Sequence, residues 1–213
     1  DYRDAKGIDL RSEREEYGAR ASVMHTSKGG LFTFTANVAP RIIYRDNADW
    51  SVFKDAIEAN PTTPMMDPEN PARYYNFMGQ VVGSNPVERQ KLEQDHADTK
   101  LLDWDATVKL NLLPLLAKEG KSNHRLTTQL MFADHQYSNN NTWFRPSTST
   151  IAINNGREGE ASRSYSKERQ QIMEWLTNYS GSFGQHNVKA MAGYSYQYSR
   201  YSGFNAYNKD FPN

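Results

Sequence analysis

The side chains that could catalyse a reaction or bind a metal are few and scattered in this sequence. Asp103 and Asp105 would share one face of a strand and could act as paired carboxylates, although lining a watery interior is the simpler interpretation. No two histidines stand four residues apart, as two ligands on one helix face would. The histidines are His25, His96, His124, His135 and His186. We therefore expect no catalytic residue, no metal site and no cofactor, and a protein that is not an enzyme.

Two further motifs have structural explanations. Glu93, Asp95 and Asp98 offer oxygen atoms to calcium, but they lack the spacing and the glycine of a calcium loop. Gly29 and Gly30 belong to a turn, because no strand–glycine–helix context of a phosphate loop surrounds them. Both motifs are better explained as solvated loops or turns.

A contact site is more plausible at Trp143, Phe144 and Arg145, which we expect in a long extracellular loop. Exposed aromatic rings can stack on sugars, and arginine can hold carboxylates or peptide carbonyls. The alternative is that these three residues pack against other loops or against a partner protein.

Composition limits the class of protein. The 213 residues include 25 basic and 25 acidic side chains, so the net charge is zero and nothing favours a nucleic-acid partner. No cysteine is present, which excludes disulfides and cysteine–zinc sites. No run approaches the roughly 20 apolar residues of a membrane helix, whereas a barrel strand needs only about 9–11, every second one facing lipid.

Alternation of apolar and polar residues is the clearest pattern, and it recurs six times, in three hairpins with short turns. The alternating segments are residues 17–26, 32–44, 102–112, 125–132, 173–183 and 188–198. Their polar positions form the face that we expect to line a lumen. The candidate lumen residues are Arg20, Arg41, Asp103, Asp105, Lys109, Arg125, Gln129, Glu174 and Lys189.

Loop lengths and aromatic positions suggest a membrane barrel. The connections between hairpins are long, about 46–101 and 138–168 with a tail after Arg200, and short turns opposite long loops are typical of outer-membrane barrels. The first long loop should contain a helix near Trp50–Ala59. Aromatic residues near both ends of the strands would form two interfacial belts. They are Tyr17, Tyr44, Trp104, Trp175 and Tyr196 far from the turns, with Phe32 and Phe183 beside them.

Proline interrupts this pattern twice. Pro40 and Pro114 fall inside alternating segments, although a proline cannot donate a hydrogen bond to a neighbouring strand. We expect a local bulge or a strand end at each.

Several segments resemble, in order along nearly the whole chain, the barrel of SusC/RagA-family TonB-dependent transporters. They are Gly7–Val23, Asn37–Arg41, Asp46–Phe53, Asn85–Arg89, Trp143–Thr150, Gly159–Tyr165, Ala192–Tyr198 and Asp210–Pro212. The resemblance implies an all-β fold: part of a large antiparallel up-and-down transmembrane β-barrel of about 22 strands. About six strands would lie here, with long extracellular loops and short periplasmic turns.

The same resemblance implies a function and partners. Members of the family import oligosaccharides or peptides across the bacterial outer membrane, together with a SusD-like surface lipoprotein. TonB supplies energy through an N-terminal part, and dimers of transporter–lipoprotein pairs are an expected assembly. Because six strands leave open edges in lipid, residues 1–213 should be a partial barrel, with the plug, the N-terminal domain and the remaining strands outside them.

One alternative remains open at this stage. A secreted or surface carbohydrate-binding β-sandwich would show similar alternation, with its apolar face against a second sheet rather than against lipid.

Overall fold

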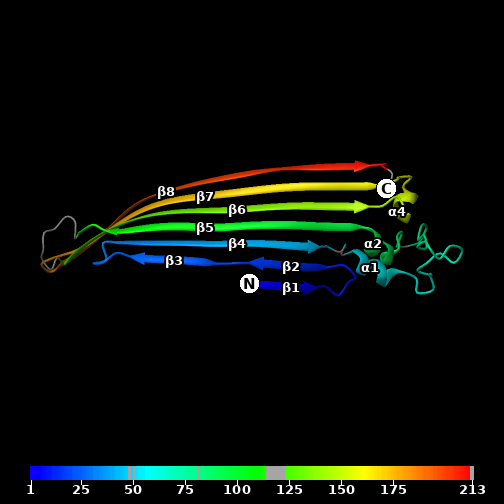
Figure 1. The fold of residues 1–213 in the computed structure, drawn as a ribbon, viewed down its shortest axis with the longest axis horizontal. Helices are drawn as coiled ribbons and strands as arrows, with labels where there is room; N and C mark the ends of the chain where they lie inside the picture. The colour runs from blue at the N-terminus through cyan, green and yellow to red at the C-terminus, as the bar shows by residue number, and fades with distance from the viewer. Residues whose placement is uncertain (48, 50, 81, 114–122, 212–213) are drawn as a thin grey trace.

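The structure, a computed structural model, describes residues 1–47, 49, 51–80, 82–113 and 123–211, most of which form one long antiparallel sheet (Figure 1). The strands are β1 (Tyr2–Lys6), β2 (Glu13–Gly18), β3 (Ala21–Thr26), β4 (Phe32–Asp46), β5 (Gln94–Asn111), β6 (His124–Arg145), β7 (Glu160–Phe183) and β8 (His186–Lys209). The helices are α1 (Ser51–Glu58), α2 (Pro86–Leu92) and α4 (Thr150–Asn154). In the described parts of the chain, no helix is long and apolar enough to cross a membrane.

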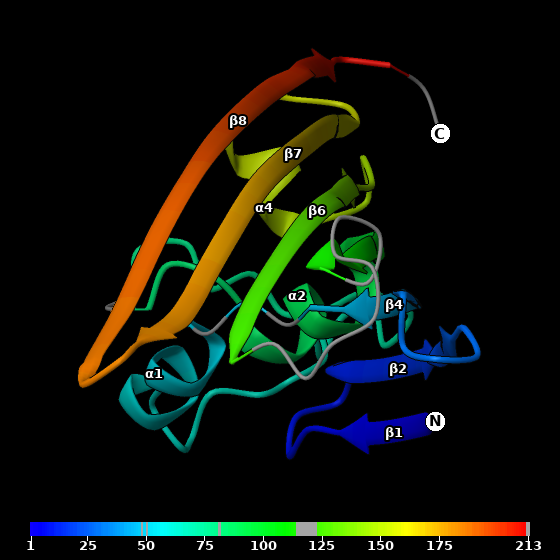
Figure 2. The ribbon, with the colours of Figure 1, turned by 90° about the vertical axis from the view of Figure 1, so that its left-hand side faces the viewer.

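The sheet is an up-and-down meander. Its strand order is β1-β2-β4-β5-β6-β7-β8, β3 also pairs with β4, and every pairing is antiparallel. Short turns lie at one end, and the helices and long loops at the other (Figure 1). Viewed along its length the sheet curves (Figure 2). It does not close on itself, since β1 and β8 are its two ends. The predicted all-β antiparallel fold is confirmed.

The strands are longer than their alternation indicated. β6 continues to Arg145 and β7 begins at Glu160, so the predicted loop over 138–168 is wrong and shrinks to residues 146–159. The predicted tail after Arg200 is also wrong, because β8 continues to Lys209. In these extensions aromatic and polar residues occur on both faces, so the regular alternation is lost. Pairing nevertheless continues, because the ladder uses backbone groups that every residue but proline carries.

The structure has eight strands where about six were predicted. β1 has no apolar alternation and pairs with β2, Tyr2 opposite Tyr17. The predicted strand over 17–26 is divided into β2 and β3, which share one register against β4. The helix predicted near 50–59 is confirmed as α1.

Pro40 explains the division between β2 and β3. The register of β4 with β5 passes Pro40 without a shift, so the expected bulge is wrong. On the other side, the amide of Ala19 donates to the Pro40 carbonyl (3.1 Å). In an antiparallel ladder such a pair exchanges two hydrogen bonds, and proline cannot return the second. The ladder is therefore interrupted here. Pro114 lies outside the described residues.

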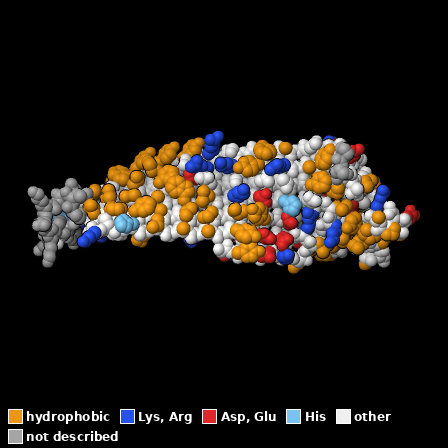
Figure 3. All heavy atoms as spheres, in the orientation of Figure 1, with side chains coloured by type: hydrophobic (Ala, Val, Ile, Leu, Met, Phe, Trp, Pro, Cys, Tyr) orange, Lys and Arg blue, Asp and Glu red, His pale blue; other side chains and the backbone are white. Residues whose placement is uncertain are grey.

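One face of β4–β8 is apolar over the part of the sheet away from the helices (Figure 3). It is formed by Phe32, Phe34, Val38, Ile42, Leu102, Trp104, Val108, Leu110, Leu126, Leu130, Phe132, Met173, Trp175, Tyr179, Phe183, Val188, Tyr194 and Tyr196. Many of these large side chains remain exposed, Leu130 by 50% and Tyr194 by 57%. An apolar surface of this extent marks contact with lipid or with another protein surface.

The apolar face has the height of a membrane. On β7 it extends from Phe183 to Met173, which is about 33 Å along the strand. A strand tilt of roughly 40° reduces this to about 25 Å, the usual height of the apolar band of a membrane barrel. Beyond it the same face becomes polar, beginning at Gln171 on β7 and Asp134 on β6.

The aromatic residues predicted for the interfaces lie at the edges of this face or one step inside. Tyr17 and Tyr44 make an edge-on contact with ring centroids 6.3 Å apart. The ring of Trp104 is 5.3 Å from that of Phe132. The Trp175 indole N–H donates to the Thr128 hydroxyl (2.9 Å), which satisfies a polar group in an otherwise apolar environment.

A β-sandwich is not what the described residues form. They build one sheet, with no second sheet facing its apolar side. Of the few buried apolar residues, Val52, Phe77, Val82 and Ala152 belong to the helical and loop region, while Ile43 and Ala97 lie in strands on the side opposite the apolar face.

Replacing Pro40 with valine should close the gap between β2 and β3. The new amide would stand opposite the Ala19 carbonyl, while the apolar face keeps an apolar residue. One net hydrogen bond of about 1 kcal/mol corresponds to a roughly fivefold slower exchange of the neighbouring amides. Hydrogen exchange by mass spectrometry on residues 18–22 measures this. Ile42→Val, on the same face and strand, is the control; equal exchange in both variants would contradict the explanation.

Candidate functional site

The register brings the predicted lumen residues to one face, opposite the apolar one. Thr33 faces Lys109, and Lys109 in turn faces Gln129. The same face includes Arg41, Asp103, Asp105, Arg125, Glu174 and Lys189. Arg20 falls in the gap between β2 and β3, outside both strands. The alternation therefore assigns the eight strand residues of this set to a common surface.

The two aspartates of this face have separate partners. Asp105 accepts a hydrogen bond from the Asn37 amide (2.9 Å), and Asp103 pairs with Nδ1 of His135 on the neighbouring strand. Each carboxylate is thus held by a cross-strand neighbour instead of by the other. Among the described residues no cluster of histidine and acidic side chains could hold a metal ion.

Positive charge collects near the turn end of the polar face. Lys109, Arg125 and Lys189 line a hollow of about 430 Å³ together with neutral residues of β6, β7 and β8. Its lining includes no carboxylate. Acidic residues of the polar face, such as Asp103 and Glu174, lie further along the strands. The surface therefore offers separate zones to anionic and cationic groups.

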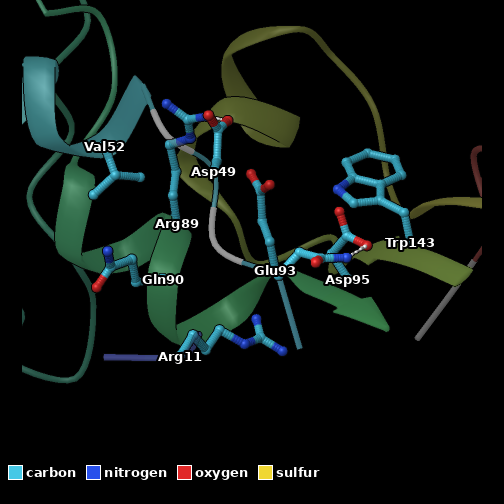
Figure 4. A pocket seen from close by; sticks show the side chains of 9 residues that line it. Arg11, Asp49, Val52, Arg89, Gln90, Glu93, Asp95 and Trp143 are labelled. Carbon is cyan, nitrogen blue, oxygen red and sulfur yellow. Dashed lines mark hydrogen bonds and ion pairs between the residues drawn. The ribbon is translucent and has the colours of Figure 1, made fainter. Parts of the chain in front are cut away.

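At the loop end, a smaller pocket of about 160 Å³ lies between α2, the start of β5 and the end of β6 (Figure 4). It is lined by Arg11, Asn47, Asp49, Val52, Arg89, Gln90, Glu93, Asp95 and Trp143. Asp95 and Trp143 face one another across β5 and β6. Mixed charge beside an indole ring suits a polar ligand or a polar loop.

Arg89 dominates the electrostatics of this pocket. Its Nη1 donates to Asp55 (2.8 Å) and to the Ser51 hydroxyl (2.9 Å), and Asp49 forms a further ion pair with it. Only 12% of the Arg89 side chain is exposed, and burial lowers the pKa of its guanidinium. These contacts fix α2 to α1.

The residues predicted to contact a ligand lie in a strand instead of a loop. Trp143, Phe144 and Arg145 are the last three residues of β6. Arg145 donates from Nε to Glu93 (2.8 Å) and from Nη1 to Glu160 (2.9 Å), and lies 4.9 Å from the centroid of Trp143.

Trp143, Phe144 and Arg145 have different neighbours, and this gives them different roles. Phe144 stacks on Phe211, with ring centroids 6.3 Å apart. Arg145 is only 17% exposed, so its carboxylate partners occupy it. Trp143 is the one that faces a pocket.

A buried glutamate, which sequence reasoning missed, links the two long loops. Glu88 is 1% exposed and accepts a hydrogen bond from the Thr150 amide (2.6 Å) and another from its hydroxyl. Thr150 is the first residue of α4, so Glu88 caps that helix from a distant loop. Burial raises the pKa of Glu88. The cap of α2, by contrast, can be recognised in the sequence, because Asn85 is followed by Pro86 and proline is common at the first position of a helix.

The fold, a single curved antiparallel sheet, is of the kind that forms part of the wall of a β-barrel. One similar solved structure is that of the RagAB peptide importer in the "open-open" state, with a TM-score of 0.63 and 14% sequence identity. The alignment covers 95% of this chain and 22% of that one, so this chain spans less than a quarter of its length. No family model matches the sequence, and no curated protein matches it. The likeness shows the fold.

The Glu88–Thr150 contact should make the loop end sensitive to pH. Burial favours protonated Glu88, so its folded-state pKa exceeds the ordinary 4.5. The loop contact should then be most stable at low pH and weaken as pH rises from about 4.5 through the raised pKa. Amide protection of residues 149–154, corrected for intrinsic exchange, should fall over this range.

Glu88→Gln should remove that dependence, because the amide does not titrate. Glu69→Gln, an exposed change in the same loop, should behave like the wild type. If amide protection of residues 149–154 still depends on pH in Glu88→Gln, a group other than Glu88 is responsible and the prediction is wrong.

Proposed function

We propose that this chain forms part of the barrel of a TonB-dependent outer-membrane transporter of the SusC/RagA class. The transporter would import oligosaccharides or peptides, working with a SusD-like surface lipoprotein. The observation that carries the proposal is the single curved sheet with two unlike faces. One face has an apolar band of membrane height, and the other is mostly polar, with scattered apolar residues such as Ile43, Leu101 and Met131.

The two ends of the sheet indicate how the proposed barrel would be oriented in the membrane. Short turns suit the periplasmic side, and the segments with α1, α2 and α4 suit the extracellular side, where cargo and a lipoprotein would meet the barrel. The likeness to a peptide importer supports transport as the activity. On this chain, the polar face would surround a plug and the transport path.

Import by such a barrel depends on positioning rather than on covalent chemistry. The cationic zone at Lys109, Arg125 and Lys189 lies near the turn end, and the pocket at Trp143 lies near the loop end. Cargo would first meet the aromatic and charged groups of the loops. It would then pass along polar side chains whose cross-strand partners hold them in place.

Membrane embedding is testable with nitroxide labels on the full-length protein. Labels at Trp104→Cys and Trp175→Cys should be relaxed strongly by oxygen and weakly by an aqueous nickel complex, because these sites face lipid. Asp105→Cys and Glu174→Cys, each next to one of these tryptophans on the same strand, point the other way and are the matched controls. Strong relaxation by the nickel complex at both tryptophan sites would refute the proposal.

The partner is tested by native mass spectrometry of the complex extracted from outer membranes in detergent. We expect a chain much longer than 213 residues in association with a lipoprotein. A long chain without a lipoprotein would overturn the partner and leave the barrel intact. A species of 24.4 kDa alone would overturn the barrel itself.

A further inference from the structure

A hollow of about 310 Å³ lies between β7 and β8, beside the loop-side edge of the apolar face. It is lined by Lys167, Arg169, Gln171, Tyr198, Arg200 and Ser202. These residues occupy alternate positions on their strands, and they face one another in the register, Lys167 opposite Ser202 and Arg169 opposite Arg200. All six therefore project from the same side of the sheet.

That side is the apolar one. Met173 and Tyr196 form the last pair of the continuous apolar band on these two strands, and the next pair on the same side, Gln171 and Tyr198, belongs to the hollow. The aromatic pair Tyr165 and Phe204 lies beyond the hollow on the same side. Tyr198 is 45% exposed. In the membrane position proposed above, the hollow lies where hydrocarbon gives way to headgroups, the depth at which tyrosine is enriched.

Two of the three cations in the hollow have no counter-charge. Arg169 donates from Nε to Asp134 (2.9 Å), whose side chain is fully buried, and Gln171 donates to the same carboxylate (3.0 Å). This holds the guanidinium in place while 45% of the Arg169 side chain stays exposed. Within the described residues, neither Lys167 nor Arg200 forms an ion pair.

The placement of Arg169 directly opposite Arg200 is unfavourable by itself, because like charges at facing positions repel. Asp134 offsets one of them. Lys167 adds a further positive charge on the same face. An anion bound between these groups would relieve the repulsion, and arginine is well suited to the oxygens of phosphate.

Elsewhere on this face, the level above the apolar band has the opposite sign. Glu13 and Glu15 of β2 and Asp46 of β4 project there, with His96 paired to Asp46. Lys100 is an isolated cation on β5. Apart from Lys100, and from Lys6 of β1, which pairs with Glu13, the positive charge of this level lies on β7 and β8, which makes it a local feature.

We propose that this hollow binds the phosphate group of a lipid of the outer leaflet, a proposal that rests on the membrane embedding proposed above. Arg169 and Arg200 would hold the phosphate oxygens, with Lys167 as a third charge. The acyl chains would lie over Tyr196 and Met173. The loop side of the band is the extracellular side, so the lipid belongs to the outer leaflet.

The test uses the full-length protein in detergent, titrated with lipid A and with dephosphorylated lipid A and followed by native mass spectrometry. The wild type should bind the phosphorylated lipid at least about tenfold more tightly. The double variant Lys167→Gln/Arg200→Gln should lose about tenfold or more in affinity for it, as expected for two basic groups at a lipid surface. Lys100→Gln, on the same face outside the hollow, should bind within about twofold of the wild type.

Three results would overturn the proposal. The first is unchanged lipid binding by the double variant. The second is equal affinity for both lipids. The third is displacement of lipid A by millimolar inorganic phosphate, which would indicate a free-anion site. Lys167→Arg/Arg200→Lys should retain binding, and this separates charge loss from misfolding. If the labels at Trp104 and Trp175 report lipid while the double variant binds lipid A as tightly as the wild type, this inference fails and the proposed membrane embedding stands.

Discussion

Hydrogen bonding between strands is the constraint on which the rest of the structure depends. A backbone that passes through hydrocarbon must satisfy every amide and carbonyl internally, since no water is there to do so. The long ladders from β4 to β8 meet that requirement with one unbroken register for each pair. Among the described strands, the one missing donor, at Pro40, is directed toward β2 and β3, at a position where the β4–β5 ladder needs none. Proline is tolerated because it interrupts a single ladder on one side.

Fixed register makes the two faces independent. Once the backbone pairs, alternate side chains can be apolar on one side and polar on the other without affecting the ladder. The sequence therefore predicts the turn-side parts of β4–β8 and the polar surface around Lys109, Asp105 and Lys189. It cannot predict where strands end, because apolar and polar residues do not alternate regularly over 138–145 and 160–168. β1 escapes prediction for the same reason.

Contacts between distant segments were beyond sequence reasoning for another reason. Glu88 and Thr150 are ordinary polar residues of two loops, and only the fold reveals that one caps the helix of the other. Arg145 was predicted to contact a ligand because arginine can hold carboxylates or peptide carbonyls, but two carboxylates from elsewhere in the chain occupy its donors. Asp134 and Arg169 lie 35 residues apart, so their pairing depends on the β6–β7 register.

In the proposed membrane position, the charge on the apolar side of the sheet follows from the same division between hydrocarbon and water. A lone charge within the apolar band would be costly there, and none of the large side chains in the band is charged at neutral pH. Charges reappear abruptly beyond Met173 and Phe132, and the first of them, Asp134, is buried and bound to Arg169. A buried carboxylate that holds one arginine beside a second, unpaired one is not needed for pairing or for solubility. The β7–β8 edge of the band therefore has a charge arrangement that the strand ladder does not explain, and a bound anion accounts for it.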